Sequence, residues 1–144
     1  MTGIIKYKKK AIKVAGHPDQ KKIIGVTVPD RTVSFDDFIT HIANHNSPYS
    51  RGVIKGVMTD AFDCLKELVL DGKNVRLSDL GLFSVGITGK SAETLADWTV
   101  QKNVTGVHLV VRNTKTWANA ELRKGVSLVE AGTYTPGESA DTGE

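Results

Sequence analysis

The sequence predicts an α+β fold in which two consecutive helices lie between groups of short strands. Residues 50–70 repeat apolar side chains at spacings of one, three and four, which is the pattern of an amphipathic helix. Residues 74–78 and 82–88 are short, apolar-alternating segments around a glycine turn, and 104–112 is predicted to be a further strand. The length of 144 residues suits one domain with at most a short appendage.

The composition is that of a soluble globular protein, with 40% hydrophobic and 24% charged residues. No apolar run approaches the roughly 18 residues that span a bilayer, and no secretory signal is visible at the N-terminus. The single cysteine, Cys64, has no second cysteine for an internal disulfide, which fits a reducing compartment. We therefore expect a cytoplasmic protein with no membrane partner.

The N-terminal segment is predicted to be a basic β-hairpin, with strands at 3–15 and 21–28 joined by a turn at 16–19. Residues 1–31 hold eight Lys/Arg against two acids, a balance of +6, whereas the remaining 113 residues have a balance of −3. Such a basic end is compatible with a polyanion partner. Lysines that protect a solvated edge strand explain it equally well, and both interpretations stay open.

Two helices follow the hairpin. Ser34 is expected to cap the first, with Asp37 three residues later, and this helix should end near His45. Ser50 can cap the second helix, and Gly72 suits the left-handed position that ends it. The apolar stripe of the second helix is too wide for one short partner helix, so we expect a homodimer whose core includes Ile54, Val57, Met58, Ala61, Phe62, Leu65 and Phe83.

The C-terminal part contains less regular sequence. Residues 89–102 are polar and aperiodic apart from Leu95 and Trp98. A short helix is predicted at 116–124 and a last strand at 126–129. From Gly132 onward the composition predicts disorder, because the segment has too little apolar surface to bury.

The passage from Leu70 to Val85 resembles the bacterial histone-like HU and integration host factor family. At this point of the chain, members of that family have the end of a helix, then an acidic residue followed by glycine, and then the pattern x-V-x-L-x-x-F/L-G-x-F-x-V. The matching positions are Gly72, Val75, Leu77, Gly81, Phe83 and Val85. The order of elements extends the resemblance over residues 33–125. It implies an intertwined dimer with a helical base, a β saddle and β-ribbon arms. The extra N-terminal hairpin resembles longer histone-like variants of some bacteria.

The resemblance implies binding of double-stranded DNA, non-specifically or by shape, as a nucleoid-associated architectural protein that condenses the chromosome. The expected division is a basic hairpin extension at 1–31, an HU-like DNA-binding domain at 32–130 and a disordered tail at 131–144. The residues expected to contact DNA are basic side chains on or beside the arm and its sheet, namely Lys73, Arg76, Lys90, Lys102, Arg112 and Lys115.

The chain departs from the family pattern at the arm tip. The Arg-Asn-Pro of that pattern is missing, and no proline occurs between Pro48 and Pro136, so no tip proline can intercalate. Leu95 or Trp98 could act as the wedge, or could pack against the other subunit. The open alternative is a dimeric HU-fold scaffold that has lost DNA bending and serves as a protein-interaction or structural module.

The sequence contains no catalytic motif that would indicate an enzyme. It has no phosphate loop, no G-x-S-x-G, no H-E-x-x-H and no cysteine pair. His41 and His45 have a spacing that can hold a metal, but no third ligand accompanies them in sequence, so a polar helix face is favoured. We therefore expect no catalysis, no cofactor, no metal and no small-molecule substrate.

Overall fold

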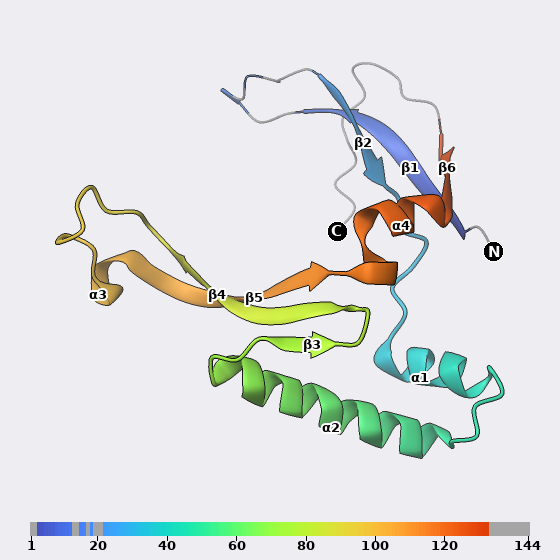
Figure 1. Cartoon of the computed structure of the whole chain (residues 1–144). Helices are drawn as coiled ribbons and strands as arrows, with labels where there is room; N and C mark the ends of the chain where they lie inside the picture. The colour runs from blue at the N-terminus through green and yellow to red at the C-terminus, as the bar shows by residue number, and fades with distance from the viewer. Residues whose placement is uncertain (1–2, 13–14, 17, 19–21, 133–144) are drawn as a thin grey trace. The chain divides into compact units, whose positions relative to one another are not determined.

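The computed structural model describes residues 3–12, 15–16, 18 and 22–132. Two compact units divide the chain: Val33–Leu122 forms one, and the two ends, Met1–Thr32 and Arg123–Glu144, form the other. Figure 1 shows helices and small sheets in succession, which confirms the predicted α+β class. Within the described residues, no helix has both the length and the apolar character needed to cross a membrane.

The unit formed by the chain ends is a three-stranded sheet in the order β2-β1-β6. Strand β1 (Gly3–Ala11) pairs antiparallel with β2 (Ile23–Thr27), which confirms the hairpin, and parallel with β6 (Val126–Glu130). The last strand was expected, but its pairing with the N-terminus was not, because a contact between chain ends leaves no local sequence signal. Residues 17 and 19 of the predicted turn and residues 133–144 of the predicted tail lie outside the described residues.

The second unit begins with helices α1 (Phe35–Ala43) and α2 (Arg51–Leu70). Both predicted caps are confirmed: Ser34 Oγ accepts from the Asp37 amide at 3.1 Å, and Ser50 Oγ accepts from the Val53 amide at 3.3 Å. Gly72, with a φ of 80°, adopts the left-handed conformation that ends α2, as predicted.

Polar contacts join the two helices. Lys55 Nζ lies 2.6 Å from Asp36 Oδ1, and Arg51 Nε donates to Thr40 Oγ1 at 2.8 Å. The hydrogen bond from Lys55 and its positive charge lower the pKa of Asp36, because both favour the carboxylate. These contacts fix the angle between the helices from their solvent side.

The sheet of the second unit is antiparallel and ordered β3-β4-β5. Its strands are β3 (Val75–Leu77), β4 (Gly81–Gly89) and β5 (Val104–Asn113), close to the predicted ranges. A short helix, α3 (Val100–Asn103), was not expected. The helix predicted at 116–124 is divided at Ala118, whose extended backbone separates the 3₁₀ turn η1 (Lys115–Trp117) from α4 (Asn119–Lys124).

The apolar core of the second unit is small. Among the described residues of the whole chain, only Ile39, Ile54 and Val69 are buried apolar side chains. Along the predicted stripe of α2, Val57 is 63% exposed and Phe62 is 48% exposed. One copy of this unit therefore leaves much of its apolar helix surface in contact with solvent.

Candidate nucleic-acid interface

The β4–β5 ribbon presents two chemically different faces, because successive side chains of a strand alternate between the faces of the sheet. The register places Phe83 opposite Val111 and Val85 opposite Leu109, and the residues two positions away continue this apolar face. The other face carries the side chains of Arg76, Ser84, Thr88, His108 and Arg112, together with the apolar Leu82 and Val110. We call this second surface the polar sheet face.

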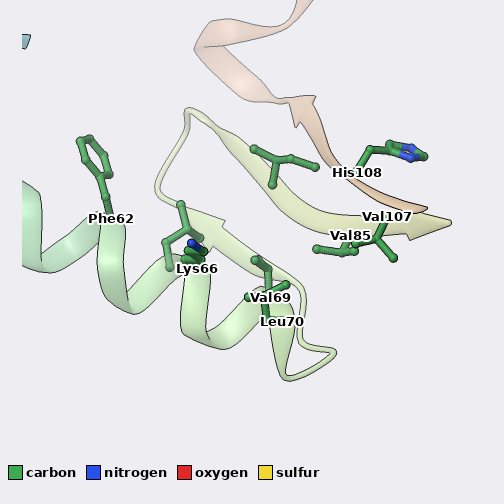
Figure 2. A pocket seen from close by; sticks show the side chains of 9 residues that line it. Phe62, Lys66, Val69, Leu70, Val85, Val107 and His108 are labelled. Carbon is green, nitrogen blue, oxygen red and sulfur yellow. The ribbon is translucent and has the colours of Figure 1, made fainter. Parts of the chain in front are cut away.

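Helix α2 lies against the apolar face. A cavity of about 440 Å³ lies between parts of the two, and its lining consists of Phe62, Leu65, Lys66, Val69 and Leu70 from the helix and Val85, Val107, His108 and Leu109 from the ribbon. Figure 2 shows the ring of His108 pointing away from α2. The polar sheet face is therefore on the side of the sheet that the helix does not cover.

Arg76 and Arg112 share the polar sheet face. Both are paired with Leu82 of the central strand, Arg76 from β3 and Arg112 from β5. Two strand spacings separate them, which is about 10 Å. Both are exposed, and neither forms an ion pair within the described part of the chain. Their guanidinium groups are therefore available to an external anion.

Two other predicted contact residues already have acidic partners. Lys73 forms an ion pair with Asp71 just after α2, and Lys115 Nζ lies 3.6 Å from Asp79 Oδ1. Each pair leaves little net charge at its position. Of the six predicted contact residues, Lys73 and Lys115 therefore form ion pairs with acidic side chains, whereas Arg76 and Arg112 form none in the described part of the chain.

The remaining two, Lys90 and Lys102, lie at the tip of the ribbon, which projects beyond α2 in Figure 1. Asn103, only 7% exposed, holds this tip together. Its side-chain oxygen accepts from the Thr99 amide at 3.0 Å, and its Nδ2 donates to the carbonyls of Lys90 at 3.0 Å and Ser91 at 3.2 Å. The tip is therefore a hydrogen-bonded structure and not an open loop.

Two glycines permit close approaches along the ribbon. A Cβ on Gly89 would lie 2.0 Å from the Asn103 carbonyl oxygen, so this position of the tip has room only for glycine. A Cβ on Gly86 would lie 2.8 Å from His108 Nε2. Glycine at that position lets the His108 ring lie across β4, where its Nδ1 is 2.6 Å from Thr88 Oγ1.

The tip loop exposes one large apolar side chain almost completely. Leu95 is 96% exposed, whereas Trp98 is 41% exposed. Nearby, Thr94 Oγ1 accepts from the Asp97 amide at 3.2 Å, which shapes the turn that carries Leu95. Leu95 is therefore the apolar side chain that this loop presents to solvent.

Sequence reasoning missed the role of Asn103. An asparagine at the end of a polar, aperiodic segment has no pattern that distinguishes a buried, hydrogen-bonded side chain from a solvated one.

The residues of the predicted dimer core do not pack together within one chain. Ile54 is buried, Met58, Leu65 and Phe83 are half-buried, and Val57, Ala61 and Phe62 are exposed.

Residues 4–128 match the model of HU-HIG, described as an HU domain fused to a wHTH, Ig or glycine-rich motif. The chain belongs to this family. The HU-HIG match includes the N-terminal hairpin and the first three residues of β6. Neither this match nor the structural one indicates an enzyme.

A crystal structure of a candidate bacterial DNA-binding protein from Bacteroides vulgatus has a similar fold, with a TM-score of 0.67 at 13% sequence identity. The similarity covers 93% of this chain and 50% of that one, so this HU-HIG chain spans about half the length of its structural relative. At this identity the likeness shows the fold alone. No curated protein matches the chain.

Replacing Asn103 with alanine should loosen the arm tip, because it removes three hydrogen bonds from a largely buried side chain. Each backbone group left without a partner there costs about 1–3 kcal/mol. Hydrogen–deuterium exchange should show faster exchange at the Thr99 amide in Asn103→Ala. The exposed neighbour Gln101, changed to alanine, is the matched control, and equal exchange in both variants would contradict the clamp.

Proposed function

We propose that this protein binds double-stranded DNA, non-specifically or by shape, as a histone-like architectural protein of the cytoplasmic bacterial nucleoid, where it contributes to chromosome condensation. The observation that carries the proposal is the polar sheet face, with Arg76 and Arg112 unpaired on the side that α2 leaves open. Membership of the HU-HIG family supports it, and so does the fold shared with a candidate DNA-binding protein.

The proposal includes a homodimer that interlocks through α2. Val53 is 51% exposed, Val57 63% and Phe62 48%, and on the ribbon Leu109 is 57% exposed. Apolar patches of this kind usually mark an interface. A second copy that covers them would also place two ribbons on one assembly, in the manner of the helical base and β-ribbon arms that the HU resemblance implies.

Charge on the exposed stripe should break the dimer. Val57→Lys buries an unpaired cation in the proposed interface, so light scattering should give the mass of one chain, whereas the unmodified protein should give twice 15.6 kDa. Asp63→Lys is the matched control, since Asp63 lies about 180° from Ile54 around the helix. A single-chain mass for the unmodified protein would overturn the dimer.

The available cations are sufficient in number for duplex binding. Arg76, Lys90, Lys102 and Arg112 would give a dimer eight positive side chains, and six to ten phosphate contacts are typical of strongly salt-dependent binders. Glu93 and Asp97 lie in the same tip loop and offset part of this charge. We therefore infer that the arginines of the polar sheet face contribute more than the tip lysines.

A gel-shift series over salt concentration with a duplex of about 30 base pairs tests this binding. Each lost phosphate contact lowers the slope of log K against log salt by about 0.9, so Arg112→Gln should lower it by about 1.8 in a dimer. The combined Lys102→Glu and Arg112→Glu change should abolish binding. Lys66→Gln, on α2 beneath the sheet, is the matched control, and slopes equal to that of the unmodified protein in all variants would exclude the polar sheet face.

Leu95 is the proposed wedge, because the tip has no proline and this side chain is 96% exposed. Insertion of an apolar side chain between base pairs costs a few kcal/mol of stacking and is offset by the contacts that bending permits. Trp98, being 41% exposed, is the second candidate.

The wedge predicts a loss of bending in Leu95→Ala. Energy transfer between dyes at the two ends of a short duplex should rise when the unmodified protein binds and rise less with the variant. Leu128→Ala, a leucine of the N-terminal sheet that is 49% exposed, controls for the loss of an exposed leucine elsewhere. Identical energy transfer for both variants would show that Leu95 does not insert.

The alternative function, a dimeric scaffold that binds other proteins, is favoured by a different observation. The apolar face of the ribbon remains exposed toward the tip, with Ile87 65% exposed and Val107 62% exposed. A protein partner could use this face without any nucleic acid. The absence of any duplex shift at low salt would favour this function over the first.

A further inference from the structure

The small sheet at the chain ends also has two unlike faces. Strand β1 alternates, so Lys6, Lys8 and Lys10 project from one face and Lys9 from the other. The register adds the side chains that share the first face, because paired residues of neighbouring strands lie on the same side. This surface, which we call the lysine face, consists of Ile4, Lys6, Lys8, Lys10, Ile12, Lys22, Ile24, Val26, Ser127 and Val129.

The lysine face has no acidic side chain among its described residues, whereas the opposite face neutralises its own lysine. Lys9 Nζ lies 3.6 Å from Glu130 Oε1 across the sheet. Lys6, Lys8 and Lys10 form no ion pair in the part of the chain that the structure describes. Lys6, Lys8 and Lys10 therefore make this face cationic.

Protection of an edge strand does not explain Lys6. Strand β1 is the middle strand of the sheet over Gly3–Tyr7, where β6 pairs with it, and beyond Tyr7 it pairs with β2 alone. Lys6 has neighbours on both sides, being opposite Val129 of β6 while its carbonyl accepts from the Val28 amide at 2.8 Å. Lys6 therefore stands on the face of a doubly paired strand and covers no open backbone edge.

The spacing of the row fits a phosphate backbone. Side chains two residues apart on a strand are about 6.6 Å apart, so Lys6 to Lys10 spans about 13 Å. One strand of a DNA duplex presents a phosphate for each 3.4 Å of helix axis, or roughly four over that length. Lys6 pairs with β6, and Lys8 and Lys10 pair with β2, so strand pairing holds the three lysines in line before a ligand arrives.

We propose that the lysine face binds the phosphate backbone of double-stranded DNA, as a second contact surface apart from the polar sheet face. The proposal rests on the proposed function for its ligand, but on different residues in a different unit of the chain. Long lysine stems carry the ammonium groups outward from the sheet. Contacts of this kind are independent of sequence.

The test compares the full chain with the triple variant Lys6→Gln, Lys8→Gln, Lys10→Gln in the same salt series. Three lost contacts per chain are six in the dimer and should lower the salt slope by about 5.4, so raising salt from 50 to 200 mM should weaken the unmodified protein roughly 1,800-fold more than the variant. A charge-retaining variant with arginine at the three positions should bind like the unmodified protein. This arginine variant shows that the sheet still folds with altered side chains.

A matched pair on one strand sharpens the comparison. Lys8→Gln and Lys9→Gln remove the same charge from adjacent positions, but only Lys8 is on the lysine face. Lys8→Gln should lower the slope by about 1.8 in a dimer, and Lys9→Gln should leave it unchanged. Equal effects of the two substitutions would overturn the proposal, since they would reflect net charge and not a surface.

The outcomes separate this inference from the proposed function. A triple glutamine variant with an unchanged slope, alongside a lowered slope for Arg112→Gln, overturns the lysine face and leaves the arm interface standing. A lowered slope for the triple variant alone supports the lysine face and removes the arm interface. If the triple change leaves DNA binding intact but abolishes sedimentation with phosphatidylserine vesicles, the face binds membranes and the proposal fails.

Discussion

The shortage of apolar partners within one copy of the Val33–Leu122 unit is the constraint on which the rest of this structure depends. A single helix pair against one three-stranded sheet buries few side chains. On α2, the side chain of Ile54 is 8% exposed, whereas that of Val57, one turn away, is 63% exposed. The hydrophobic effect favours covering such a stripe at roughly 25 cal/mol per Å². The cavity between α2 and the ribbon is a part of the same uncovered surface.

The two-residue period of the ribbon strands directs Val85, Val107 and Leu109 toward α2, and it directs the two arginines of the polar sheet face away from the helix. A shift of one residue between β4 and β5 would exchange the two faces and direct Arg112 toward the helix. Gly89 and Asn103 oppose such a shift at the tip, where the close approach and the side-chain hydrogen bonds allow one alignment. The same contacts that stabilise the arm therefore also determine which side chains reach solvent.

Local sequence patterns predicted most helices and strands, but they did not predict contacts between residues far apart in the chain. Ser34, Ser50 and Gly72 are recognisable because capping depends on neighbouring residues, and the structure confirms all three. The parallel pairing of β6 with β1 joins residues more than a hundred positions apart, so no window of sequence contains it. The sequence could not show which of the six predicted contact residues form ion pairs. Whether Asp71 reaches Lys73 and Asp79 reaches Lys115 depends on how the folded chain places their side chains.

The distribution of ion pairs is more informative than the net charge of +3. Lys9, Lys55, Lys73 and Lys115 each have a carboxylate partner within the chain. The cations left without one in the described residues include Arg76 and Arg112 on one sheet and Lys6, Lys8 and Lys10 on the other. Folding thus concentrates available positive charge on one face of each sheet, although the acids and bases nearly balance overall. Exposed pairs contribute little to stability, so their main effect is to limit where an anion can bind.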